Sequence, residues 1–218
     1  KVGQLVMEAA AKRLTSLTLE LGGKSPVYVD KSANIKAAAR SISWGRLFNA
    51  GQTCVAPDYA LVHKDVADLF IKQLEQENNK YSTEHQGVMS QIAHDGHLQQ
   101  MNSFIEDARG KCEKIIGGKI DSQSRACSPT IVVNPEDKTK VAQEEIFGPI
   151  LVLYTVNSLD DAICKINSRE RPLSIYIFSK SSKAQERIIA ETRAGSTVIN
   201  ETVVQFTNSN LPFGGSGK

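Results

Sequence analysis

Two hydrophobic patterns alternate along this chain. Short, nearly continuous runs of apolar and β-branched residues, of which 173–178 is the clearest, favour buried strands. Between them lie longer stretches whose apolar residues recur every three or four positions, such as Ile35, Ala38 and Ile42, and these favour amphipathic helices. Because strands that alternate with helices are typical of an α/β fold, we expect a doubly wound, largely parallel sheet flanked by helices.

Turn and cap residues divide the chain into individual elements. Glycine pairs, Asn134-Pro135 and Gly148-Pro149 mark boundaries, and Asn34 and Ser158 are suitable helix N-caps. The predicted helices are 2–13, 34–47, 66–74, 92–110, 158–166 and 181–192. The predicted strands are 17–21, 27–29, 59–63, 114–116, 130–133, 140–142, 151–156, 173–178 and 196–200.

Composition and charge narrow the class of function. The 218 residues include 26 basic and 24 acidic side chains, spread along the chain to a net charge of +2, with no basic stripe for nucleic acid. This balance favours a small-molecule partner. The four cysteines, irregularly spaced and without a C-x-x-C pair, fit neither a metal site nor a dense disulfide framework. We therefore expect no metal, and reduced thiols in an intracellular compartment.

A cysteine in a shaped loop is the first candidate for chemistry. Cys54 lies in the run G-Q-T-C-V-A-P at residues 51–57. Taken alone, a free cysteine is more often a small buried packing residue than a nucleophile. Gly51 and Pro57, however, indicate a loop after a helix, and loops on a rigid scaffold are where reactive groups are displayed. Cys54 is therefore a candidate nucleophile.

A carboxylate beside two glycines is the second candidate. Glu20 stands near the end of an apolar run, shortly before Gly22 and Gly23. A carboxylate there is either a salt-bridged strand end or a group that faces a cavity. Because the glycines let a ligand or a second loop approach the backbone closely, Glu20 is a candidate general base.

Two further runs suggest a ligand site less strongly. In E-E-I-F-G-P at 144–149, paired acids stand beside an aromatic ring and a rigid turn, which suits a sugar hydroxyl and a planar ring. An ordinary solvated acidic turn has the same composition. The run L-P-F-G-G-S-G at 211–217 is either a backbone-shaping loop near a ligand or a flexible exit.

Taken together and in this order, the four runs resemble the aldehyde dehydrogenase superfamily. The signatures are E-L-G-G-K at 20–24, G-Q-T-C at 51–54, E-E-I-F-G-P at 144–149 and P-F-G-G-x-G at 212–217. The continuation V-A-P-D-Y at 55–59 resembles the class 3 and fatty aldehyde dehydrogenase branch. The resemblance implies that Cys54 is the catalytic nucleophile and that Glu20 is the general base.

The same resemblance implies how a cofactor and a substrate are held. It implies that Glu145 binds the ribose of the nicotinamide nucleotide and that Phe147 lies near the nicotinamide. Asn200 and Phe213 match positions that shape the substrate region and its loop. The implied reaction oxidises a medium- or long-chain aliphatic or aromatic aldehyde to the carboxylic acid with NAD, or with NADP, through a thiohemiacetal and a thioester of Cys54.

The resemblance also implies a larger parent protein. The chain begins within a helical pattern and stops after a glycine-rich turn, so we expect a fragment. Residues 1–21 would end a Rossmann-like coenzyme domain and 22–218 would form the catalytic domain, so the chain alone is expected to be poorly active. The parent is expected to be a homodimer. It is expected in the cytoplasm or on the cytoplasmic face of the endoplasmic reticulum, outer mitochondrial membrane or lipid droplet, where some members of the branch are anchored by a tail beyond this segment.

Two other classes of protein stay open at this point. A non-catalytic scaffold has no need of both Cys54 and Glu20. A cysteine hydrolase without a cofactor would need a histidine beside its thiol. The four histidines lie in patterns typical of a strand end or of polar helix surface; they are His63, His85, His94 and His97.

Overall fold

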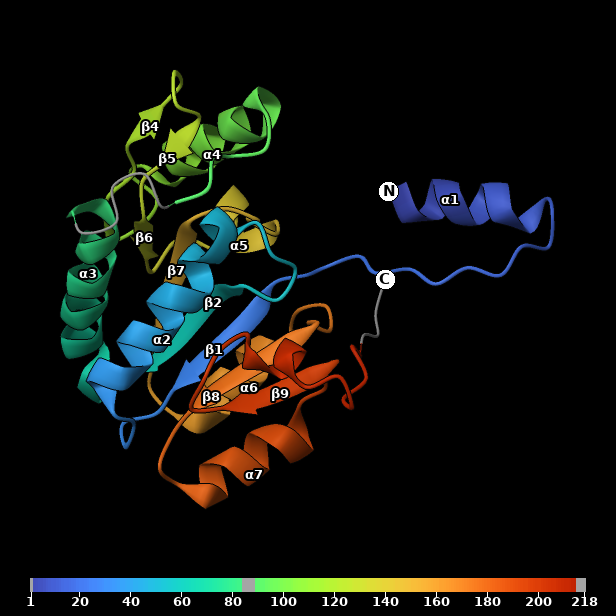
Figure 1. Cartoon of the computed structure of the whole chain (residues 1–218). Helices are drawn as coiled ribbons and strands as arrows, with labels where there is room; N and C mark the ends of the chain where they lie inside the picture. Colours follow the sequence, from blue (N-terminus) through green and yellow to red (C-terminus); the bar gives the residue numbers. More distant parts are fainter. Residues whose placement is uncertain (1, 84–88, 215–218) are drawn as a thin grey trace.

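A seven-stranded sheet forms the centre of the molecule, with the strand order β3-β6-β7-β2-β1-β8-β9 (Figure 1). The computed structural model describes residues 2–83 and 89–214. The strands, in sheet order, are Lys114–Ile116 (β3), Thr130–Val133 (β6), Ile150–Val156 (β7), Pro57–His63 (β2), Ser25–Val29 (β1), Ser174–Phe178 (β8) and Ser196–Ile199 (β9). Neighbouring strands are parallel, except for the antiparallel pair β3 and β6. The largely parallel α/β fold expected from the sequence is confirmed.

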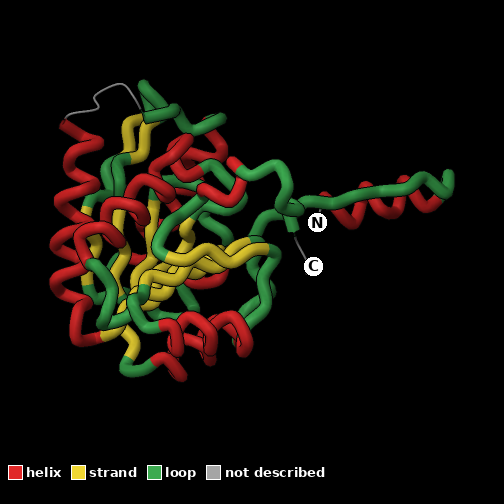
Figure 2. Tube along the Cα trace, turned by 60° about the horizontal axis from the view of Figure 1, so that its bottom comes forward, coloured by secondary structure: helices red, strands yellow, loops and turns green. Residues whose placement is uncertain are grey.

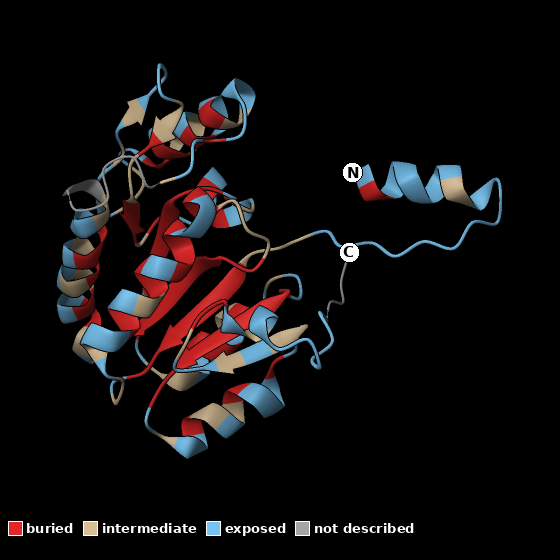
Figure 3. Ribbon diagram, viewed as in Figure 1, coloured by how far each residue is buried: buried red, intermediate tan, exposed pale blue. Residues whose placement is uncertain are grey.

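Helices cover both faces of this sheet. The longer ones are Ile35–Leu47 (α2), Ala67–Thr83 (α3), Asp95–Ala108 (α4), Leu159–Asn167 (α6) and Ser182–Glu191 (α7). Buried residues of α2 and α3 pack on one face of the sheet, and those of α4, α6 and α7 pack on the other. Figure 3 shows the resulting core as buried strands between half-buried helices. A small hairpin, Ile120–Asp121 (β4) and Ala126–Cys127 (β5), stands apart near α4.

Side-chain caps explain where several helices begin. Asn34 accepts a hydrogen bond from the Ala37 amide at 3.3 Å, and Ser158 accepts one from the Asp161 amide at 3.1 Å. Such caps satisfy amide groups that have no partner inside the first helical turn. Both caps were predicted from the sequence. The short helix Lys140–Gln143 (α5) and the 3₁₀ turns Phe48–Gly51 (η1), Lys64–Val66 (η2) and Val204–Thr207 (η3) connect the larger elements.

The N-terminal helix, Val2–Ala11 (α1), and the extended segment after it project away from the body (Figures 1 and 2). Gly3 packs against Leu21 of that returning segment. The apolar side chains of Val2, Leu5 and Met7 are 54–73% exposed. Division of the chain near residue 21 into two domains stays a prediction.

Two predicted strands are wrong. Residues 17–21 form no strand; no strand of the described residues pairs with them, and their alternating leucines are exposed. Residues 140–142 belong to α5 instead, where Val141 and Ala142 are buried. The predicted helix at 92–110 spans only Asp95–Ala108.

Candidate active site

Three of the four signature runs meet at one edge of the sheet. Glu20 precedes β1, Cys54 precedes β2 and Glu145 precedes β7. Because β7, β2 and β1 are neighbouring parallel strands, their amino ends lie side by side. The candidate site therefore lies at the amino ends of the strands, whereas open α/β sheets generally bind ligands at the carboxyl ends.

Glycines let these runs touch each other. Gly22 has φ +78°, and a Cβ atom added there would lie 2.8 and 2.9 Å from the carboxylate oxygens of Glu145. Gly51 has φ +73°, and its added Cβ would lie 2.5 Å from the carbonyl carbon of Gly148 and collide with its oxygen. Gly148 in turn packs directly on Met101 of α4. The close approach of the three runs requires glycine at these positions.

Cys54 occupies a turn that its neighbours hold in place. The Ala56 amide donates to the Thr53 carbonyl at 2.9 Å, which closes the turn around Cys54. The Tyr176 hydroxyl donates to the Val55 carbonyl at 2.6 Å. The half-buried thiol side chain packs beside a small apolar cluster that consists of Val55, Leu173 and Val203. The loop is thus fixed by hydrogen bonds and carries an apolar wall.

The electrostatic surroundings keep the Cys54 thiol protonated. Burial raises the pKa of Cys54, and the carboxylates of Glu20 and Glu145 raise it further. The backbone N–H groups of Cys54 and Val55 act in the opposite direction. The main influences on this pKa include no histidine of the described part of the chain. His63 lies at the far end of β2, and His85 lies outside the described residues.

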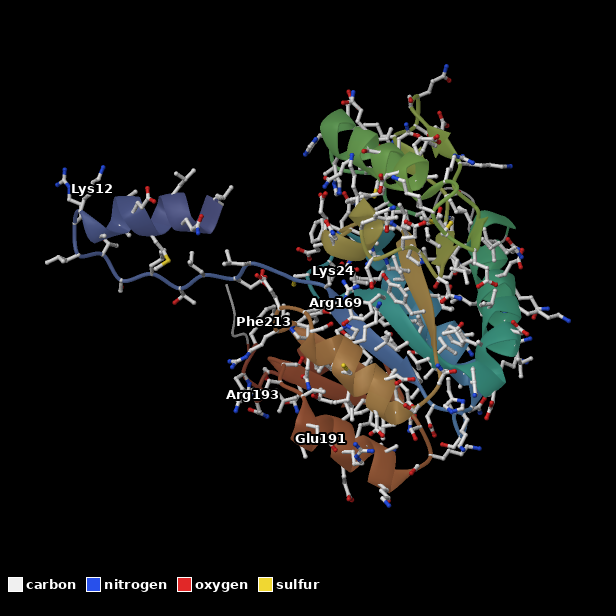
Figure 4. The ribbon with its side chains drawn as sticks, turned by 180° about the vertical axis from the view of Figure 1, so that it is seen from behind. Lys12, Lys24, Arg169, Glu191, Arg193 and Phe213 are labelled. Atoms are coloured by element: carbon white, nitrogen blue, oxygen red, sulfur yellow. The ribbon has the colours of Figure 1, made fainter. Side chains whose placement is uncertain are left out.

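Glu20 and Glu145 both line an open cavity of ≈ 930 Å³. Its wall also includes Gly23, Arg169 and Gly214, whereas Cys54 does not line it. Figure 4 shows Arg169 and Lys24 next to each other where the N-terminal segment joins the body. Glu20 is exposed, and its Oε1 accepts a hydrogen bond from the Gly22 amide at 3.0 Å. The sequence left two interpretations of Glu20, a salt-bridged strand end or a group that faces a cavity, and this position agrees with the second.

Glu145 is a half-buried carboxylate with a perturbed pKa. Burial raises the pKa of Glu145 to about 7; the Gly23 amide opposes this rise, Asp58 adds to it, and Arg46 and Lys24 lower the pKa. A carboxylate in a cavity wall beside glycine backbone is suited to accept hydrogen bonds from hydroxyl groups.

Phe147, two residues after Glu145, presents an exposed ring. Its backbone is left-handed, with φ 49°, and the ring is 38% exposed. The ring stacks on His97, with ring centres 6.0 Å apart and planes at 24°. Burial lowers the pKa of His97, which favours the neutral ring beneath Phe147.

Sequence reasoning assigned no role to the buried charges behind these runs. Lys24 Nζ lies 2.5 Å from Asp58 Oδ1, and the two side chains are 11% and 1% exposed. Arg46 is buried near them and donates from Nη1 to the Pro57 carbonyl at 3.0 Å. A signal was present, because charged residues beside otherwise apolar strand starts are costly unless they are paired.

Asn200 lies away from the other candidates. It follows β9 at the carboxyl edge of the sheet, with φ 57°. Its side chain accepts from the Ser179 amide at 3.0 Å and donates to the Ser179 carbonyl at 3.2 Å. The structure therefore gives Asn200 the role of joining the ends of β8 and β9, and does not bring it to Cys54.

The loop after Asn200 returns to the amino edge. Val203 packs beside Cys54, and Gly214 packs on Gly195, just before β9. Phe213 is 48% exposed and stacks on Phe206, with ring centres 5.1 Å apart. The run around Phe213 thus shapes a loop next to the cavity, while residues 215–217 of that run lie outside the described residues.

Comparison with known proteins identifies relatives of this chain. A sequence model of the Aldehyde dehydrogenase family matches residues 1–218. The chain is 41% identical over 224 residues to "Aldehyde dehydrogenase family 3 member A2" of Mus musculus, covering 99% of this chain and 44% of that protein. It is 42% identical over 224 residues to "Aldehyde dehydrogenase, dimeric NADP-preferring" of Rattus norvegicus, covering 99% and 48%.

A solved structure shows the same fold. The substrate-bound state of Staphylococcus aureus AldH superposes with a TM-score of 0.92 at 42% identity, covering 99% of this chain and 47% of that one. The chain spans about half the length of the curated relatives that it matches. The family match along the whole sequence and the meeting of the signature runs at one sheet edge show that this chain belongs to the aldehyde dehydrogenase family.

Proposed function

We propose that this chain carries the catalytic residues of an NAD(P)-dependent aldehyde dehydrogenase, which oxidises an aldehyde to the carboxylic acid. The observation that supports this most directly is the meeting of the runs of Cys54, Glu20 and Glu145 at one edge of the sheet, where both carboxylates raise the pKa of the thiol. A thiol and a base so placed can form a covalent adduct with a carbonyl compound and then hydrolyse it.

The first step is attack by the Cys54 sulfur on the aldehyde carbon. Because burial and the carboxylates keep the thiol protonated, a base must accept its proton as the S–C bond forms. Glu20, exposed in the cavity wall, is the base that we assign. The carbonyl electron pair moves onto oxygen, where the Cys54 backbone N–H would donate to the developing charge.

The residues present fit a nicotinamide cofactor. In the cavity wall, the Glu145 carboxylate can accept hydrogen bonds from hydroxyl groups. Gly22 and Gly23 have no side chains to cover the backbone beside it, and Phe147 exposes a flat ring. When bound, NAD or NADP supplies the acceptor for the hydride. Glu145 would hold the ribose hydroxyls and Phe147 would flank the ring, so that both orient the cofactor toward Cys54.

Hydrolysis then releases the acid. After oxidation the acyl group is bound to Cys54 as a thioester. Glu20 first releases the thiol proton to solvent and then accepts a proton from water. The hydroxide adds to the thioester carbonyl, and the C–S bond breaks with the electron pair returning to sulfur, which regains a proton from Glu20. The carboxylic acid then leaves.

The remaining parts of the proposal concern substrate and assembly. The apolar wall of Val55, Leu173 and Val203 beside the thiol suits a medium- or long-chain aliphatic or aromatic aldehyde.

We assign residues 1–21 to the end of a coenzyme domain, since the apolar face of α1 is exposed in this chain. A homodimer is proposed because the rat relative is named dimeric, and NADP stands beside NAD because that relative is named NADP-preferring. Within the described residues, none of the helices combines the length and apolar character needed to cross a membrane.

The test is an assay of the protein at its natural full length with an aliphatic aldehyde and NAD or NADP. We expect absorbance of the reduced nicotinamide to appear with the wild type and to vanish with Cys54→Ser. Turnover of esters with no aldehyde-dependent reduction would replace the proposal with a cysteine hydrolase. Robust reduction by residues 1–218 alone would overturn the expectation that this segment is poorly active.

A further inference from the structure

A buried ion pair contacts the backbone on both sides of Glu145. Lys24 Nζ donates to the Glu144 carbonyl at 2.6 Å, and also to the Val141 carbonyl at 2.9 Å. Asp58 Oδ2 accepts from the Ile146 amide at 3.0 Å, while its Oδ1 accepts from Lys24 at 2.5 Å. The peptide groups before and after Glu145 are thus held by the two members of one ion pair.

Burial makes this arrangement costly. The side chain of Asp58 is 1% exposed and that of Lys24 is 11% exposed. Removing two charges from water costs several kcal/mol per ion, and their mutual attraction returns little net stability. Stability alone therefore does not explain the pair, whereas the hydrogen bonds that it makes to residues 144 and 146 give it a geometric role.

A third buried charge acts on the same carboxylate. Arg46 Nε and Nη2 are buried and have no hydrogen-bond partner among the described residues. Its charge, like that of Lys24, favours the ionised form of Glu145, and Asp58 opposes it. Glu145 in turn raises the pKa of the Cys54 thiol. Ionised Glu145 and Asp58 are therefore two anions that face the two cations Lys24 and Arg46.

We propose that Lys24 and Asp58 are positioning residues, which hold the peptide groups flanking Glu145 and so fix its carboxylate over Gly22 and Gly23 where a nucleotide ribose would bind. This inference rests on the proposed role of Glu145 as a cofactor ligand. It assigns the pair to cofactor binding and leaves the chemistry of the thiol to other residues.

The charges predict opposite pH behaviour for the two partners. Lys24→Met removes a cation, so the pKa of Glu145 rises and cofactor affinity is lost at a higher pH than in the wild type. Asp58→Asn removes an anion, so the pKa of Glu145 falls and the loss moves to a lower pH. If the two residues had a merely structural role, the pH profiles of cofactor affinity in the two variants would shift in the same direction or would not shift.

The experiment uses the protein at its natural full length and measures the Michaelis constant for NAD or NADP from pH 5 to 9. We expect each variant to raise this constant by about tenfold or more at pH 8, because a shift of a binding group by about 1 Å weakens its interactions by such a factor. Hydrolysis of an activated ester by Cys54, which needs no cofactor, should change little. Lys111→Met removes an ion pair of 2.7 Å at the end of α4 and is the matched control.

A single variant leaves the other charge buried without a partner, which destabilises the fold, so a double variant is included. Lys24→Met with Asp58→Leu removes both charges and both contacts, and such exchanges are often tolerated. We expect it to remain folded by circular dichroism and still to bind cofactor weakly. Wild-type affinity in the folded double variant would overturn the inference. If the wild type itself reduces no cofactor, the proposed function fails instead.

Discussion

A methyl group at Gly51 should damage the site, because this residue fits against the backbone of another signature run. Its φ of +73° is unfavourable for alanine by roughly 1–2 kcal/mol. The added Cβ would lie 2.5 Å from the carbonyl carbon of Gly148 and 2.9 Å from the carbonyl oxygen of Arg46. Both neighbours are backbone, so the loop must move, and such overpacking costs about 1–3 kcal/mol more. We expect Gly51→Ala to lower the free energy of unfolding by about 2–5 kcal/mol.

Gly110 provides a matched control for the backbone strain. Its φ is +71°, and an added Cβ there meets nothing within 4 Å. Gly110→Ala should therefore show only the conformational cost, about 1–2 kcal/mol. Urea unfolding of the protein at its natural full length measures both values. Alkylation by iodoacetamide, followed peptide by peptide, reports whether the Cys54 loop has moved. Equal stability losses in the two variants would refute the tight contact between Gly51 and Gly148.

Three further predictions concern charge and hydrogen bonding. The folded state raises the pKa of Glu145 from 4.5 to about 7, so its contribution to stability is full below pH 4.5 and is lost as pH rises to about 7. Glu145→Gln should therefore remove this pH dependence from the free energy of unfolding, and an unchanged pH dependence would contradict the prediction. Glu20→Gln should speed alkylation of Cys54 at fixed pH, since one like charge is gone, yet slow aldehyde turnover by about 100-fold or more; faster turnover would exclude Glu20 as the base. Tyr176→Phe removes the 2.6 Å bond to the Val55 carbonyl and should cost about 1 kcal/mol in urea unfolding; full stability would show that this bond contributes nothing.

Much of the fold was predictable because it depends on local patterns. The continuous apolar runs that became β1, β2, β7 and β8 and the capped helices α2 and α6 are fully specified by periodicity and turn residues. Residues 140–142 were misjudged because three residues are too few to show a period. The alternating leucines at 17–21 have the period of a strand, but no strand of the described residues pairs with them.

The candidate site was predictable in its members more than in its geometry. Once β1, β2 and β7 are known to be parallel neighbours, the runs before them must meet, and the motif residues Cys54 and Glu145 follow. The pairing of Lys24 with Asp58 joins residues far apart in sequence, and no local pattern specifies it. The family resemblance assigned Asn200 to the substrate region, but it lies at the opposite edge of the sheet, where its hydrogen bonds to Ser179 determine its role.

The position of the site at the amino ends explains which contacts must hold it. In a site at the carboxyl ends of strands, the functional side chains come directly after buried strand residues, which hold them in place. Here Glu20, Cys54 and Glu145 precede their strands, and loops packed on one another orient them. The parallel strands place the three runs next to each other, and the glycines let the runs touch. The Lys24–Asp58 pair holds the peptide groups on either side of Glu145. Since these contacts, together with the hydrogen bond from Tyr176 to the Val55 carbonyl, all lie within the described residues, we expect ester hydrolysis by Cys54 to be separable from cofactor reduction.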